Sequence, residues 1–136
     1  MPSSIVRLSG DSALAPSPYA YSATTDGASR PIFVAGACPL DRQGEVRFPG
    51  DVEAQAGLCL DDLRTAVAEA GATLGDLIYT RVIVATAHQS ELVRAWDVVH
   101  ATFAEHEVPS TLSGVTVLGY PGQLVEIEAV AAVPLA

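Results

Sequence analysis

The alternation of apolar and polar residues near the end of the chain predicts a β-strand with two different faces. Over residues 123–133, one face is wholly apolar and consists of Val125, Ile127, Ala129, Ala131 and Val133. The other face carries Leu124, Glu126, Glu128, Val130 and Ala132. We expect the apolar face to pack against helices. Two carboxylates among apolar neighbours indicate that water, a partner or a ligand meets the opposite face.

Five further segments have the composition of β-strands. They are residues 4–8, 19–25, 32–35, 77–85 and 112–118. The turn sequence Gly-Tyr-Pro-Gly at residues 119–122 predicts a hairpin between the last two strands of the chain. The dipeptide Asp26-Gly27 predicts a longer hairpin between the second and third strands.

Two segments have helical periodicity. The first is expected to begin at the N-cap Asp51 and to end at Gly71. Its apolar face consists of Val52, Ala56, Cys59, Leu60, Leu63, Val67 and Ala70. The second is expected to be capped by Ser90 and to end before Val108-Pro109. Its apolar face consists of Leu92, Trp96, Val99 and Phe103.

The predicted order of elements is β-β-β-α-β-α-β-β, with no internal repeat and no long linker. We therefore expect a single α+β domain over residues 1–136, a mixed β-sheet with two helices packed on one face. The uncovered face includes Leu124 and Val130. Because an apolar face of that size is rarely left in water, the pattern predicts self-association.

The charge of the chain narrows the classes of function. Sixteen acidic residues stand against seven arginines, there is no lysine, and the net charge is −9. Such a chain repels phosphate backbones, so we expect no binding to nucleic acid and no ribonuclease activity. The lack of lysine also excludes an internal Schiff base and an anchor for pyridoxal phosphate.

Cysteine and histidine spacing indicates no metal site. Cys38 and Cys59 form no CxxC pair, and the histidines at 88, 100 and 106 have no metal-ligand spacing. The apolar runs fall far short of the ~20 residues that span a bilayer, and the sequence MPSSIVRLSGDS lacks a signal pattern. We expect a cytoplasmic protein with no membrane partner.

Four stretches of the chain carry a family resemblance. They are VAGACPLD, GDVEAQA, the Pro-Ser-Thr run at Pro109 and LVEIEAVAAV. In order and spacing, over residues 19–133, they resemble the RidA/YjgF family, many of whose members hydrolyse reactive enamines and imines to keto acids and ammonia. The resemblance implies the chorismate mutase-like RidA fold and a homotrimer with inward-facing sheets and inter-subunit clefts.

Glu126 is the candidate catalytic residue. By resemblance, it matches the pocket glutamate that positions water or substrate near the imine carbon, and a carboxylate there can take a proton from water. The structural alternative is a salt bridge between subunits. For Glu128 this alternative is the favoured interpretation.

Ser110 marks a departure from the family. The active deaminases carry an arginine shortly after a proline, and counting back from the VEIE glutamate puts Ser110 there. A guanidinium holds a substrate carboxylate with two charge-assisted bonds, whereas serine offers one neutral donor. Replacing this arginine by serine would cost about 2 kcal/mol of the free energy of substrate binding. Three alternatives follow. Another arginine binds the substrate carboxylate, with Arg30 and Arg81 best placed to do so, or the ligand is not a simple carboxylate, or the catalytic role is lost.

Three other residues are assigned to substrate binding. By resemblance, Tyr19 borders the pocket, with Tyr21 as the alternative, and the backbone of Gly36 borders the ligand. Tyr120, in the turn before the last strand, is expected to close over the pocket mouth. Cys38 is interpreted as a small apolar residue rather than as a reactive thiol.

The sequence therefore predicts a RidA-like homotrimer that binds a small metabolite. Its expected reaction is hydrolysis of an enamine or imine to a carbonyl compound and ammonia, with an atypical substrate because of Ser110. No cofactor is expected, because a protonated imine is already electrophilic. One alternative is a non-catalytic trimer that binds a metabolite or a partner. Another is a specialised hydrolase or isomerase of a biosynthetic pathway.

Overall fold

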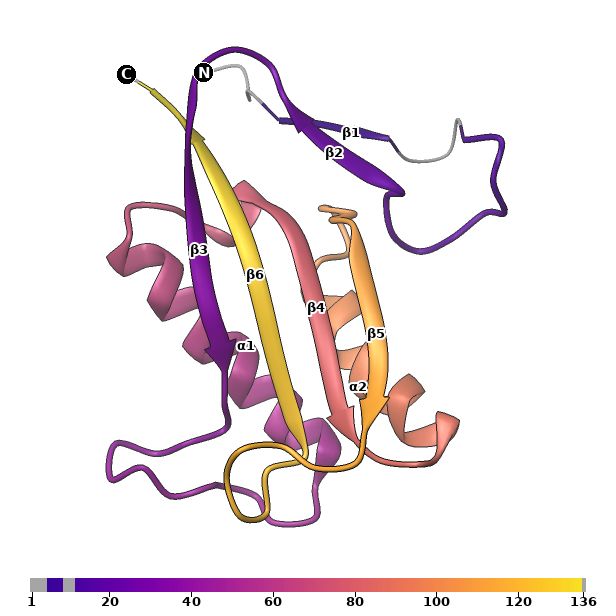
Figure 1. The fold of residues 1–136 in the computed structure, drawn as a ribbon, viewed down its shortest axis with the longest axis vertical. Coiled ribbons are helices and arrows are strands. Elements are labelled where there is room, and N and C mark those ends of the chain that lie inside the picture. The colour runs from indigo at the N-terminus through magenta and orange to yellow at the C-terminus, as the bar shows by residue number, and fades with distance from the viewer. Residues whose placement is uncertain (1–4, 9–11, 136) are drawn as a thin grey trace.

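The computed structural model describes residues 5–8 and 12–135 and contains a mixed sheet backed by two helices (Figure 1). The elements in chain order are β1 (Ile5–Leu8), β2 (Ser22–Thr25), β3 (Ser29–Ala37), α1 (Val52–Glu69), a 3₁₀ turn (Leu74–Asp76), β4 (Leu77–Ala85), α2 (Gln89–Thr102), β5 (Ser110–Val115) and β6 (Val125–Pro134). Ser4, predicted to begin the first strand, lies outside the described residues. The predicted α+β class, mixed sheet and one-sided pair of helices are confirmed.

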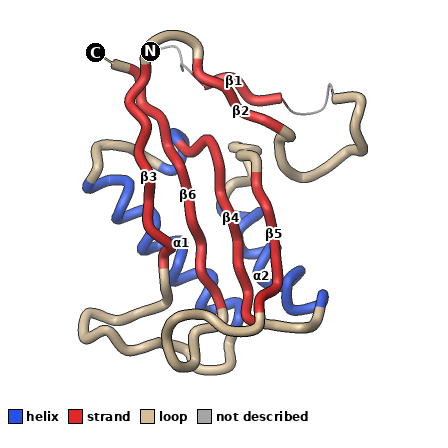
Figure 2. The backbone as a smooth tube through the Cα atoms, in the orientation of Figure 1, coloured by secondary structure: helices blue, strands red, loops and turns tan. Residues whose placement is uncertain are grey.

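The main sheet has the strand order β3-β6-β4-β5 (Figure 2). β6 runs antiparallel to both of its neighbours, β3 and β4, and β5 runs parallel to β4. The predicted hairpin between the last two strands is therefore wrong, because β4 lies between β5 and β6. α2 makes the crossover that a parallel β4–β5 pair requires, and residues 116–124 carry the chain past the end of β4. β5 ends at Val115 and does not reach residue 118.

β1 and β2 form a separate two-stranded antiparallel sheet. The hairpin predicted at Asp26-Gly27 is also wrong, because β2 pairs with β1 whereas β3 pairs with β6. Gly27 still makes a tight turn, with φ +85°, but this turn leads from the small sheet into the main one. Tyr19 lies in a bend before β2, outside the strand in which it was predicted.

α1 begins and ends where its sequence predicts. The Asp51 carboxylate accepts a hydrogen bond from Ala54 N at 3.0 Å, and Gly71 takes a left-handed φ of +88° just past the helix. α2 begins two residues earlier than predicted, because His88 rather than Ser90 occupies the N-cap position. The His88 backbone is held there by its N–H, which donates to Thr86 Oγ1 at 3.0 Å.

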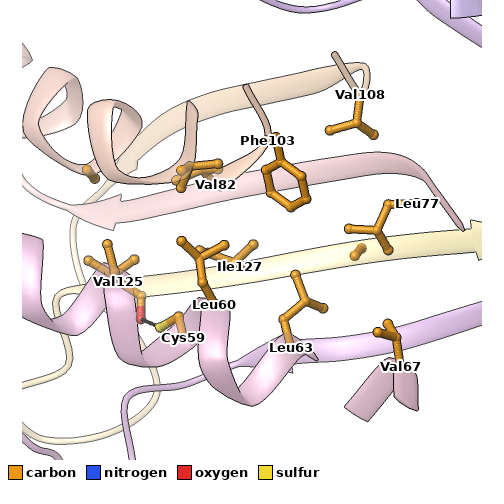
Figure 3. Packing of buried hydrophobic residues seen from close by; sticks show 14 of the residues in the cluster. Cys59, Leu60, Leu63, Val67, Leu77, Val82, Phe103, Val108, Val125 and Ile127 are labelled. Carbon is orange, nitrogen blue, oxygen red and sulfur yellow. Dashed lines mark hydrogen bonds between the residues drawn. The ribbon is translucent and has the colours of Figure 1, made fainter. Parts of the chain in front are cut away.

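The hydrophobic core lies between the helices and one face of the sheet (Figure 3). The predicted apolar face of β6 is confirmed for Val125, Ile127, Ala129 and Ala131, which are all buried, while Val133 is half-buried. From α1, the core receives Val52, Ala56, Cys59, Leu60, Leu63 and Val67. No helix within the described residues is long and apolar enough to cross a membrane.

The other face of the sheet is not covered by either helix, and we call it the open face. Glu126, Glu128 and Val130 of β6 lie on it and are half-buried. Phe33 of β3, which pairs with Val130, is 80% exposed there. A large aromatic side chain with so much exposure marks this face as a surface that a single chain leaves uncovered.

Candidate functional site

The Glu126 carboxylate is held on the open face where β6 meets the end of β3. Cys38 Sγ donates to Glu126 Oε1 at 3.3 Å, and Gln123 Nε2 approaches the same oxygen at 3.5 Å. The β3–β6 register shifts between Val34 and Ala37, next to this point. Such irregularities re-aim side chains and are frequent beside active sites. The carboxylate is therefore oriented by donors from two different segments of the chain.

Gly36 leaves the space that the Glu126 carboxylate occupies. A Cβ atom on Gly36 would lie 2.5 Å from Glu126 Cδ and 2.7 Å from Oε2. A side chain at position 36 would therefore force the Glu126 carboxylate to move. The sequence prediction that Gly36 permits close approach agrees with this contact, although the group in contact is the carboxylate of Glu126.

Gln123 connects the turn before β6 to the carboxylate and was missed in the sequence. Its side chain is buried, with Nε2 donating to Val125 O at 3.1 Å and Oε1 accepting from Tyr120 N at 3.2 Å. Its position directly after Gly122 was the available signal, because a polar residue that begins a buried strand needs partners for its amide.

Cys38 acts as a hydrogen-bond donor to Glu126, a contact that its interpretation as an apolar residue missed. Burial, together with the hydrogen bond and charge of Glu126, raises the pKa of Cys38 from 9.0 to about 11. The thiol therefore keeps its proton at neutral pH, and its S–H group donates a hydrogen bond to the Glu126 carboxylate. Cys59 lies in the core as predicted, and burial raises its pKa as well.

An open hollow of about 650 Å³ is lined in part by Gly36 and Cys38, the two residues that contact this carboxylate, and we call it the loop hollow. It is lined by Gly36, Cys38, Leu40, Asp41, Arg42, Arg47, Leu58, Asp62 and Tyr120. Most of these residues belong to the loop between β3 and α1. Tyr120 comes from the loop before β6, and Figure 1 shows the two loops side by side at one end of the sheet. Tyr120, assigned to the pocket mouth, thus borders the same hollow as Gly36.

Tyr19 and Ser110 line a different hollow, of about 430 Å³, beside α2. Its other lining residues are Pro18, Trp96, Thr111 and Leu112. The Tyr19 ring packs edge-on against Trp96 with centroids 6.1 Å apart. Tyr21 does not line this hollow, since its hydroxyl donates to the backbone oxygen of Ala15. We call this second region the α2 hollow.

Ser110 and Glu126 lie on opposite faces of the sheet. Ser110 pairs with the buried Thr80, whose Oγ1 donates to Ser110 Oγ at 2.8 Å on the side of the helices. The next residue, Thr111, alternates to the open face, where Tyr79 donates to it at 3.0 Å. A single chain therefore brings together Gly36, Tyr120 and Glu126 but leaves Tyr19 and Ser110 apart from them.

The two arginines expected to reach a pocket have other partners. Arg81 Nη1 lies 3.9 Å from Glu128 Oε1 in a cross-strand ion pair on the open face. Arg30 Nη2 donates to Ala70 O at 3.3 Å, at the end of α1. Glu128 thus forms a salt bridge within the chain. No cluster of three or more His, Cys, Asp or Glu that could hold a metal is found among the described residues.

The chain is similar to a set of known proteins. A family model described as Endoribonuclease L-PSP matches residues 11–133. The 2-iminobutanoate/2-iminopropanoate deaminase of Escherichia coli (strain K12) is 36% identical over 103 residues, which cover 74% of this chain and 77% of that protein.

The structure of YyfB of Yersinia pestis, a Rid-family protein of unknown function, matches with a TM-score of 0.84 and 25% identity, covering 96% of this chain and 99% of that one. E. coli TdcF with bound serine matches with a TM-score of 0.64 and 29% identity, covering 92% of each chain. The E. coli YjgF gene product matches with a TM-score of 0.64 and 30% identity, covering 86% of this chain and 89% of that one.

Proposed function

The chain belongs to the Endoribonuclease L-PSP family, which includes the RidA/YjgF proteins, and we propose that it hydrolyses a small enamine or imine to a carbonyl compound and ammonia. The observation that carries the proposal is the Glu126 carboxylate, which is oriented by Cys38 and Gln123 and contacts Gly36 and Cys38 of the loop hollow. The relative named as an imine deaminase supports the reaction type.

Glu126 is the proposed base. A water molecule held by the carboxylate adds through its oxygen to the carbon of a protonated C=N bond, and Glu126 takes the proton that the water releases. Glu126 then returns that proton to the nitrogen of the resulting amino alcohol. The C–N bond breaks as the hydroxyl gives its proton to the regenerated carboxylate, so that the carbonyl forms and ammonia leaves. The donors Cys38 and Gln123 keep the carboxylate aimed, which is how positioning contributes to rate. No step requires a cofactor.

The open face is the proposed interface of a homotrimer with inward-facing sheets. The interface would bury the apolar side chains of Phe33, Tyr79 and Val130. The loop hollow near Glu126 would then become a cleft between subunits. The proposed contacts of Tyr19 and Ser110 with substrate depend on this assembly, since their hollow is separate within one chain. The proposal retains a cytoplasmic location and a small metabolite as the ligand.

The substrate is proposed to be an imine or enamine rather than RNA. A net charge of −9 with no lysine opposes binding to a polyphosphate, despite the description that the family carries. Ser110 Oγ accepts a hydrogen bond from Thr80 and offers a carboxylate at most its own proton. We therefore propose an atypical substrate, one whose binding does not depend on an arginine at position 110.

The test compares Glu126→Gln with Glu128→Gln on freshly generated 2-iminobutanoate and a panel of related imines. Turnover by the wild type that is lost in Glu126→Gln, with ligand affinity and melting temperature retained, supports the proposal. Glu128→Gln is the matched control, because it removes a neighbouring carboxylate on the same face and should keep most of the activity. Equal turnover by Glu126→Gln and the wild type would exclude Glu126 as the base.

The second candidate is a non-catalytic trimer that binds a metabolite or a partner. The observation that favours it is the pair of donors on Glu126, because a carboxylate that already accepts two hydrogen bonds also suits a purely structural role. Under this alternative, the wild type shows no turnover on any imine of the panel while still binding a small ligand.

A further inference from the structure

Five of the seven arginines are committed to partners within the chain. Arg64 and Arg94 form ion pairs with Asp61 and Glu53, and Arg81 pairs with Glu128. Arg30 donates to the carbonyl of Ala70, and Arg7 donates to the carbonyls of Gly75 and Leu77. These five side chains are not available to a ligand without breaking a contact.

Arg42 and Arg47 are the exceptions, and both line the loop hollow. Neither guanidinium makes a hydrogen bond or an ion pair with any part of the chain that the structure describes. The Arg47 guanidinium lies over the Phe48 ring, 5.2 Å from its centroid, which leaves its N–H groups free for an acceptor. Two cations with open donors thus border the hollow that contains Gly36, the neighbour of the Glu126 carboxylate.

The acids of the same hollow do not neutralise these arginines through direct contact. Asp41 Oδ1 accepts from the backbone N–H groups of Gln43 and Glu45 at 2.9 and 3.0 Å, so it is used within the loop. Asp62 projects from α1, and burial, together with the charge of Asp61, raises its pKa. The lining therefore offers positive charge from the loop and a carboxylate from α1, and its residues Gly36 and Cys38 both contact the Glu126 carboxylate. This arrangement suits a ligand with one carboxylate and one cationic nitrogen.

The loop that presents Arg42 and Arg47 is held in a strained shape. Phe48 has φ 55°, and it is the one non-glycine with positive φ among the residues described. Its carbonyl is fixed by the buried Gln55 amide, which donates at 3.1 Å. A strained backbone persists where the surroundings fix it, and it is common at ligand-binding sites.

We propose that Arg42 and Arg47 bind the carboxylate of the substrate, supplying from the loop the charge that Ser110 does not provide. The substrate class is then a small monocarboxylate with its C=N group directed toward Glu126. This inference rests on the proposed function for the identity of the ligand, but binding of the carboxylate does not require turnover. Arg42 and Arg47 act as binding residues that determine specificity.

The test measures binding of the keto acid 2-oxobutanoate and of its uncharged methyl ester by calorimetry to the intact wild-type protein and three variants. In Arg42→Ala/Arg47→Ala, affinity for 2-oxobutanoate should fall at least tenfold, with affinity for the ester unchanged. Arg42→Lys/Arg47→Lys should retain intermediate affinity, since lysine keeps the charge but not the planar fork. Arg64→Ala is the matched control, since it removes an exposed arginine outside the hollow, and it should bind both ligands as the wild type does.

Three results would overturn the inference. Wild-type affinity of the double alanine variant for 2-oxobutanoate would mean that the carboxylate is held elsewhere. Equal loss of affinity for acid and ester would indicate a general effect on the hollow. A change in the mass of the assembly would assign the arginines to an interface. The two proposals can fail separately. If neither the wild type nor any variant hydrolyses imines, but binding of 2-oxobutanoate still depends on the two arginines, the proposed hydrolysis is wrong and this inference stands.

Discussion

A Cβ atom on Gly36 would lie 2.5 Å from Cδ of Glu126, so the glycine and the carboxylate occupy one shared space. The contact joins the bulged end of β3 to β6, two strands that are far apart in the sequence. It fixes how closely the backbone of one strand can approach the candidate base on the other.

Gly36→Ala should therefore displace the Glu126 carboxylate. We expect kcat for imine hydrolysis to fall about a hundredfold, the typical effect of misplacing a catalytic group by ~1 Å. Gly119→Ala is the control, because nothing lies within 4 Å of a Cβ at that position, and it should keep wild-type activity. Steady-state kinetics checks both, and full activity in Gly36→Ala would show that the carboxylate position is not critical.

The reactivity of Cys38 should report on its contact with Glu126. Because its pKa is raised to about 11, the thiol should react with iodoacetamide at pH 8 roughly a hundredfold more slowly than an ordinary thiol. Glu126→Gln removes a negative charge that raises this pKa and should speed alkylation, measured by mass spectrometry. An unchanged rate in that variant would contradict the contact, and the buried Cys59 should stay unlabelled throughout as an internal control.

The same pKa gives a pH dependence of stability. The folded state holds the Cys38 proton more tightly than the unfolded state, whose thiol titrates near its ordinary value of 9.0. This contribution to the free energy of unfolding is therefore complete below about pH 9 and is lost as the pH rises toward about 11. Urea unfolding between pH 9 and 11 should show that the free energy of unfolding declines less steeply in Cys38→Ser than in the wild type. An identical decline in the two proteins would exclude Cys38 as a source of this pH dependence.

Gln55→Ala should lower the free energy of unfolding by about 3 kcal/mol, because it removes a buried amide and leaves three partly buried backbone groups without its hydrogen bonds. The Gln55 amide donates to Phe48 O and Gly122 O at 3.1 and 3.2 Å and accepts from Leu124 N at 2.8 Å. It thereby joins the two loops that border the loop hollow. Denaturant unfolding checks the value, and Gln43→Ala, an exposed loop glutamine, should change stability by less than about 0.5 kcal/mol.

Phe33→Asp should dissociate the proposed trimer, because it would place a charge in the apolar part of the interface. Phe33 is 80% exposed on the open face of a single chain, whereas Val93 is 53% exposed on α2. Analytical ultracentrifugation should give the mass of one subunit for Phe33→Asp and the wild-type mass for Val93→Asp. A trimer that survives Phe33→Asp, or a wild-type monomer, would exclude the open face as the interface.

Short-range sequence patterns are enough to predict the local structure around the site. Strict alternation in β6 fixed which side chains face the core, and it placed Glu126 on the opposite face. The N-cap Asp51 and the left-handed Gly71 bracket α1, because each satisfies a backbone requirement within a few residues of itself. The family resemblance, confirmed by the match over residues 11–133, followed from short motifs of the same kind.

The tertiary structure alone decided which strands are neighbours. The turn at residues 119–122 suggested a hairpin, but β5 pairs with β4 in parallel, and this register puts Ser110 on the helix side, away from Glu126. Strand pairing depends on burying the whole sheet against α1 and α2, a free energy summed over distant residues that no local pattern contains. For the same reason, the contacts of Glu126 with Cys38 and Gly36 appeared only once β3 and β6 were paired.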